Sequence, residues 1–136
     1  MTIFSALGVA STGITVHRKW MDAVSDNITN INTAKPTSED AFEARYVIAE
    51  AVDYGTEFNG VQVGGTVLSG KTEGRLVYDP GHPLADVEGY VRMPDIDLGS
   101  QMTQLMMAQR GYQANLSVAD RAQGAYQAAI QLGRNT

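Results

Sequence analysis

Apolar residues recur at alternating steps of four and three at both ends of the 136-residue chain, and this spacing is the strongest constraint on its fold. A heptad spacing of this kind is typical of long helices that pack side by side. The N-terminal row consists of Ile3, Leu7, Ala10, Ile14, His17, Met21, Val24, Ile28 and Ile31. The C-terminal row consists of Leu98, Met102, Leu105, Gln109, Tyr112, Leu116, Ala119, Gln123, Tyr126 and Ile130. We therefore predict two long helices, over residues 3–31 and 97–132.

Residues 36–95, between the predicted helices, have the pattern of a small β-rich insert. Residues 42–52 are rich in β-branched and aromatic side chains, and residues 60–68 alternate polar and apolar between glycines. Asp79-Pro-Gly-His-Pro is a turn signature. Between Glu39 and Asp95 there are eleven acidic and only four basic residues, so we expect the insert to be acidic and solvated.

The chain thus divides into three predicted segments. Residues 1–35 form the N-terminal helix and an Asn-rich exit, residues 36–95 the insert, and residues 96–136 the C-terminal helix. Asp97 suits the N-cap of the second helix, and Gly133 suits its stop. Because the first helix leaves where the second begins, the predicted fold is mainly α, with the terminal helices paired as an antiparallel coiled coil.

The far side of the second predicted helix is unusual for a free coiled coil, which should carry Glu, Lys and Arg there. It carries small and apolar residues such as Ala114 and Val118, and only Arg110 and Arg121 are charged. We interpret this helix as packed on several sides, as in a polymer. The expected interface residues are Ile14, Met21, Val24, Ile28, Leu98, Met102, Leu105, Tyr112, Ala114 and Leu116.

Composition argues against several other classes of protein. The net charge of −5 argues against a nucleic-acid partner, and the absence of cysteine excludes disulfides and thiolate metal sites. The histidines and the pair Asp95 and Asp97 have structural explanations in place of chemical ones. His17 lies on the heptad row, His82 lies in the turn, and the two aspartates precede or cap the second helix. We expect no enzyme activity, with no catalytic residue, metal, cofactor or small-molecule substrate. Without a charged n-region we also expect no cleaved signal peptide.

Three motifs resemble those of the flagellar basal-body rod protein family. Asn27-Ile-Thr-Asn-Ile-Asn-Thr resembles the Asn-rich signature after the first helix of rod and hook proteins. The segment from Pro80 to Asp97, Pro-Gly-His-Pro-Leu-Ala-Asp-Val-Glu-Gly-Tyr-Val-Arg-Met-Pro-Asp-Ile-Asp, is similar to one typical of proximal-rod subunits. Met106-Met-Ala-Gln-Arg-Gly-Tyr-Gln-Ala-Asn resembles the C-terminal motif of the family. Lys35-Pro36 stands where the family usually has Gly-Tyr. The motif residues are Asn27, Asn30, Asn32, Gln109, Arg110 and Asn115.

This resemblance implies a structural subunit of the bacterial flagellar rod. Such a subunit is exported through the flagellar type III apparatus without a cleaved signal and polymerises in the periplasm into a torque-transmitting shaft. The implied partners are copies of itself, other rod proteins, and the membrane-ring base with its adapter. Asn27, Asn30 and Asn32 are expected to bind backbone groups where the first helix ends. Two alternatives remain, another axial flagellar subunit such as a different rod or hook-type protein, and a coiled-coil adapter that never polymerises.

Overall fold

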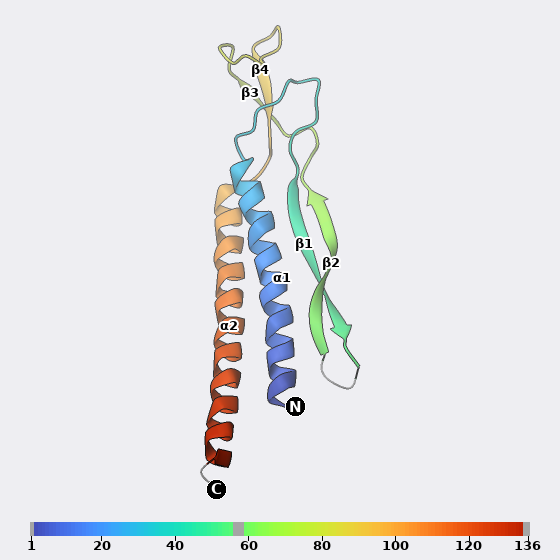
Figure 1. Cartoon of the computed structure of the whole chain (residues 1–136). Coiled ribbons are helices and arrows are strands. Elements are labelled where there is room, and N and C mark those ends of the chain that lie inside the picture. The colour runs from blue at the N-terminus through green and yellow to red at the C-terminus, as the bar shows by residue number, and fades with distance from the viewer. Residues whose placement is uncertain (1, 56–58, 135–136) are drawn as a thin grey trace. The chain divides into compact units, whose positions relative to one another are not determined.

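The computed structural model describes residues 2–55 and 59–134. Glu57, one of the acidic residues of the predicted insert, lies outside them. Along the chain the elements are α1 (Ile3–Thr29), β1 (Ala44–Asp53), β2 (Asn59–Ser69), β3 (Arg75–Tyr78), β4 (Tyr90–Met93) and α2 (Leu98–Arg134) (Figure 1). The predicted order of a helix, a β insert and a second helix is confirmed. Gly133 lies inside α2, so it is not the predicted stop.

The chain forms two compact units. Unit 1 comprises Met1–Met21, Val47–Gly65 and Met106–Thr136, and unit 2 comprises Asp22–Tyr46 and Thr66–Leu105. Each unit therefore contains a part of α1, a part of α2 and a part of the strand pair β1–β2. The strands β3 and β4 belong to unit 2.

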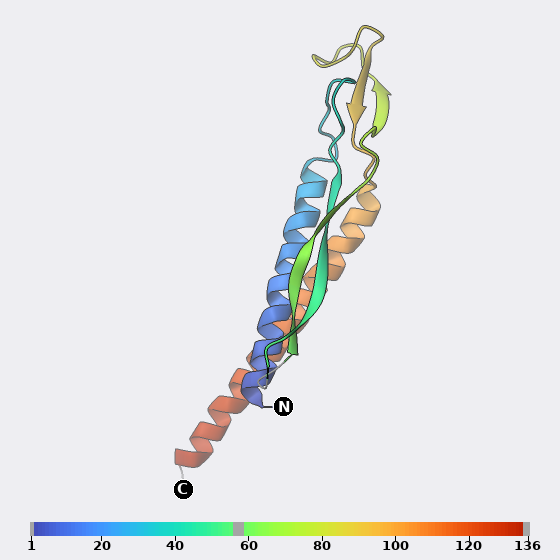
Figure 2. The same cartoon turned by 90° about the vertical axis from the view of Figure 1, so that its right-hand side faces the viewer.

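In unit 1, α1 contacts α2 on one side and the β1–β2 pair on the other (Figures 1 and 2). The ring of Phe4 meets the ring of Tyr126 edge-on, with centroids 5.5 Å apart. Further along α1, the ring of His17 lies against Gly111. Residue numbers rise along α1 while they fall along α2, so the two helices run in opposite directions. On the other side of α1, Thr12 Oγ1 accepts a hydrogen bond from the Val61 amide at 3.2 Å.

The side of α2 that meets α1 differs from the predicted heptad row. Leu98, Met102 and Leu116 of that row are 49%, 47% and 42% exposed, whereas Gln101 and Ala108 are buried. With 100° of rotation per residue, the buried side lies about one residue around the helix from the predicted one. Within one chain, the buried side of α2 and the predicted row thus coincide only in part, at Leu105 and Tyr112, which are half-buried.

Glycines on both helices account for this difference, because each lets a side chain of the other helix come close. A Cβ added to Gly13 on α1 would lie 2.6 Å from Asn115 Oδ1 on α2, and one added to Gly111 would collide with His17. Glycine on each helix allows this proximity, which larger apolar residues would prevent. The expected interface residues on α1 are more buried. Val24 is fully buried, and Ile14, Met21 and Ile28 are half-buried.

Unit 2 contains the antiparallel pair β3–β4, in register from Arg75 opposite Met93 to Tyr78 opposite Tyr90. Lys35 extends this pairing, because its amide donates to the Arg92 carbonyl at 2.8 Å and its carbonyl accepts from the Arg92 amide at 2.9 Å. The Arg92 guanidinium donates to the Thr37 carbonyl at 2.7 Å and to the Glu73 carbonyl. Arg92 thus holds the segment that leaves α1 through Lys35-Pro36.

Two local predictions in unit 2 are confirmed. Asp97 caps α2, since its Oδ2 accepts the Ser100 amide at 2.7 Å and its carbonyl accepts the Gln101 amide at 3.1 Å. The segment from Asp79 begins a turn, because its carbonyl accepts the His82 amide at 3.1 Å.

Candidate functional site

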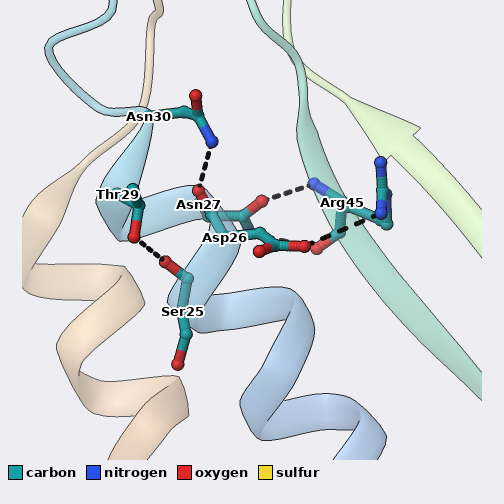
Figure 3. A network of polar contacts seen from close by, with 6 residues as sticks. All are labelled: Ser25, Asp26, Asn27, Thr29, Asn30 and Arg45. Carbon is teal, nitrogen blue, oxygen red and sulfur yellow. Dashed lines mark hydrogen bonds and ion pairs between the residues drawn. The ribbon is translucent and has the colours of Figure 1, made fainter.

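Asn27 is the centre of a buried polar network in unit 2. Its Oδ1 accepts the Arg45 amide at 2.8 Å, and its Nδ2 donates to the Arg45 carbonyl at 2.9 Å (Figure 3). The same Nδ2 donates to Oε1 of Gln101 at 2.9 Å, and Gln101 Nε2 donates to the Tyr46 hydroxyl at 3.1 Å. Asn27 and Gln101 are both almost completely buried. This network connects α1, β1 and α2, and it confirms that Asn27 binds backbone groups.

The other asparagines of the first motif make weaker or no such contacts. Asn30, the residue after α1, donates from Nδ2 to the Asp26 carbonyl in the last turn of the helix at 2.9 Å (Figure 3). Asn32 is exposed. The nearby ion pair between Asp26 and Arg45 is 3.7 Å long and joins two side chains that are about half exposed, so it contributes little to stability.

Asn115, the last residue of the C-terminal motif, contacts α1. Its Nδ2 donates to the Gly111 carbonyl at 2.8 Å, and its side chain fills the space beside Gly13. His17 lies one turn along α1, with its Nδ1 2.7 Å from the Gly13 carbonyl oxygen. Gln109 and Arg110 of the same motif are exposed. The motif therefore has one part that packs within the chain and another that faces outward.

Two exposed apolar surfaces follow α2. The first is the heptad row (Leu98, Met102, Leu105, Tyr112 and Leu116), of which Leu105 and Tyr112 are half-buried and the rest exposed. The second, which we call the small-residue strip, lies on the other side of the α1 contact and consists of Met107, Ala114, Val118 and Ala125, all exposed. Large exposed apolar surfaces on a soluble chain mark sites of association.

The turn between β3 and β4 is a third exposed feature. Asp86 Oδ1 accepts the amides of Glu88 and Tyr90 at 3.0 and 2.9 Å, and its Oδ2 accepts the Thr37 hydroxyl at 3.0 Å. These hydrogen bonds, that from Tyr90 foremost, hold the pKa of Asp86 below its usual value of 3.8. Val87, at the tip of this turn, is fully exposed.

The described residues offer exposed apolar surfaces for association. Among residues 2–55 and 59–134, no group of three or more His, Asp or Glu side chains is placed to hold a metal ion. Neither α1 nor α2, as far as the structure describes them, is long and apolar enough to cross a membrane.

Comparison with known proteins identifies the class. Residues 87–132 match the family model for the C-terminal part of flagellar basal-body rod FlgEFG proteins. The flagellar basal-body rod protein FlgC of Salmonella typhimurium is 30% identical over 136 residues, which cover 98% of this chain and all of the relative. FlgC of Bacillus subtilis is also 30% identical and covered in full, and FlgC of Borreliella burgdorferi is 32% identical with 98% covered. The chain belongs to the FlgC family of flagellar basal-body rod proteins, which are structural subunits of the rod.

Several residues of the site escaped sequence reasoning. Gln101 and Tyr46 complete the Asn27 network, although each is separated from Asn27 by a long stretch of chain. Gln101 lies beside the predicted row, four residues after the N-cap Asp97, and nothing about a polar residue at this position indicates burial. The glycines Gly13 and Gly111 carried a usable signal, since glycine in a helix interior often marks close packing.

Proposed function

We propose that the chain polymerises through its terminal helices into the proximal part of the rod, the shaft that transmits torque in the bacterial flagellum. In this proposal α1 and α2 pair as an antiparallel coiled coil, and each copy packs its helices against those of neighbours. The partners are copies of itself, other rod proteins, and the membrane-ring base with its adapter. The role is mechanical, with no nucleic acid, cofactor or small-molecule substrate.

The proposed place of action is the periplasm. The chain reaches it through the flagellar type III apparatus, without cleavage of a signal peptide. Membership of the FlgC family supports this route.

The exposed heptad row is the observation that carries the proposal. Leu98, Met102 and Leu116 are each about half exposed in the single chain. Covering the exposed half of each side chain with a neighbouring helix contributes about 1 kcal/mol. The single chain leaves these portions of the row exposed, whereas a polymer covers them at every interface. The small-residue strip allows a further helix to approach α2 closely.

Ala114→Lys on the small-residue strip tests this mode of assembly. Ala114 is exposed, so lysine, a good helix former, should change the stability of the free chain by only a few tenths of a kcal/mol. In the polymer, the same lysine adds bulk and charge at a packed contact, with a cost of about 1–3 kcal/mol at every copy. Cells with this variant should export the protein but assemble few complete rods, as counted in purified basal bodies, and swim poorly.

Ala114→Ser is the matched control, because serine keeps the small size at the same position. We expect it to leave rod counts and swimming close to those of the parent. Normal rods in the Ala114→Lys strain would argue against a helix packed on several sides and in favour of a non-polymerising adapter. Absence of the unmodified chain from purified basal bodies would refute the proposed function itself.

A further inference from the structure

Val87 is an exposed apolar residue on a turn that is firmly held. Besides the side-chain bonds to Asp86, the Asp86 amide donates to the Tyr90 carbonyl at 2.9 Å, and the Gly89 amide donates to the Asp86 carbonyl at 3.0 Å. Gly89 has a φ of 85°, a conformation that favours glycine. Leu84, in the same turn, is also exposed. An ordered apolar tip loses little entropy on docking, which favours binding.

The turn carries negative charge. Asp79, Asp86 and Glu88 lie between residues 79 and 91, and the same stretch contains no lysine or arginine. Glu88 is exposed and directly follows Val87. A surface that receives this turn should therefore combine apolar walls with a basic side chain.

Unit 1 contains a groove with these properties between α1 and the β1–β2 pair. It has a volume of about 300 Å³, and its lining includes Thr12, Thr15 and Lys19 from α1 and Tyr54, Val61 and Val63 from the strand side. The Thr12 hydroxyl is already engaged, since it donates to the Val9 carbonyl at 2.7 Å and accepts the Val61 amide. The walls of the groove are thus largely apolar.

Lys19 supplies the basic side chain of this groove. It is exposed, and within residues 2–55 and 59–134 no carboxylate lies within ion-pair distance of its ammonium group. Its position on the groove lining leaves its charge available to an acidic segment that enters.

We propose that the turn at Leu84 and Val87 of one copy docks in the groove of a second copy, with Glu88 facing Lys19. Both partners of this contact are present on the same chain, so identical copies are sufficient to form it. Repeated head-to-tail from copy to copy, this contact builds a ring or a helical array. The inference rests on the proposed function, to which it adds a contact that does not involve α2.

Cysteine cross-linking tests the contact directly, because the chain contains no cysteine of its own. The test variant is Val63→Cys with Val87→Cys, and basal bodies containing it are purified and oxidised. A disulfide forms only when the two Cα atoms come within about 7 Å, so docking predicts a ladder of covalent multimers of this chain on denaturing gels.

The matched control is Ile48→Cys with Val87→Cys. Ile48 is 40% exposed, similar to the 38% of Val63. Its neighbours Val47 and Ala49 face Val16 and Trp20 of α1, so strand alternation directs Ile48 away from that side. The control should form few disulfide-linked multimers. Lys19→Glu in the test variant should lower the yield of multimers, and a further Glu88→Lys should restore it.

The outcomes separate this inference from the proposed function. Basal bodies that contain the test variant but yield no more multimers than the control overturn the docking contact and leave the proposed function intact. A disulfide within a single chain, seen as a monomer of altered mobility, overturns the assignment of the groove to a second copy. The proposed function depends instead on the presence of the unsubstituted chain in basal bodies purified from the parent strain.

Discussion

Replacing Asn27 by alanine should destabilise the chain more than any other substitution in its Asn-rich motif. The buried carboxamide makes three hydrogen bonds, two to the backbone of Arg45 and one to Gln101. Alanine leaves the Gln101 oxygen without its donor at a site that is only 1% exposed. An unsatisfied buried polar group costs about 1–3 kcal/mol.

The Arg45 amide and carbonyl add a smaller cost, because Arg45 is exposed and water can replace part of the lost bonding. We therefore expect Asn27→Ala to lower the free energy of unfolding by about 2–4 kcal/mol. Urea unfolding of the purified chain, followed by circular dichroism and by the fluorescence of its single tryptophan, Trp20, measures this change. With a urea m-value of about 1–3 kcal/mol/M, the midpoint should fall by roughly 1 M or more.

Asn30→Ala is the matched control, since it removes the same side chain from the same motif. Asn30 is only half-buried, and its side chain bonds only to nearby groups, the Asp26 carbonyl and the Thr33 hydroxyl, so its loss should cost about 0.5 kcal/mol or less. Asn27→Asp keeps the shape but directs a second acceptor at the Arg45 carbonyl, so it should also destabilise at neutral pH. If Asn27→Ala and Asn30→Ala unfold at the same urea concentration, the argument from buried hydrogen bonds is wrong.

Three further predictions concern other parts of the chain. Gly111→Ala should lower the free energy of unfolding by about 1–3 kcal/mol because its methyl group meets His17, whereas Gly124→Ala meets open space and should raise it by up to about 1 kcal/mol. If the two variants shift the urea midpoint in the same direction, the tight contact of Gly111 with His17 is contradicted. Hydrogen exchange of the dilute chain should be slow at Gln101 and Ala108 and fast over residues 123–134, which are exposed on every side. Strong protection of residues 123–134 from hydrogen exchange would contradict this prediction. The turn at Asp86 should stay ordered at neutral pH and lose its hydrogen bonds only as the pH falls through the lowered pKa of that carboxyl. An NMR titration that gives Asp86 a pKa of 3.8 or above would refute the role of the Tyr90 amide.

Local sequence signals predicted the elements of this fold well. The heptad spacing located both helices, and Asp97 marked the start of α2. The turn at Asp79 and the two longer strands also lie where their residue types indicated. Each of these features depends on residues close together in the chain, so a single sequence contains the necessary information. The same holds for the three motifs, which indicated the rod family.

The contacts between these elements could not be predicted in the same way. The heptad row on α2 identified an apolar surface, but a pattern along one helix does not say whether its own chain or a neighbour covers that surface. The partners of Asn27 are 18 and 74 residues away, so the sequence could predict its bonding to backbone but not the strand that supplies it.

The sequence by itself therefore determined the helices, the insert, their order and the family. Only the tertiary structure decided that Gly111 and Asn115 of α2 meet α1 while Leu98, Met102 and Leu116 stay exposed. The physical reason is that glycine leaves room for a side chain of the facing helix, with which a larger residue at the same position would collide. The larger apolar side chains of the heptad row are left exposed on α2, where neighbouring subunits can cover them.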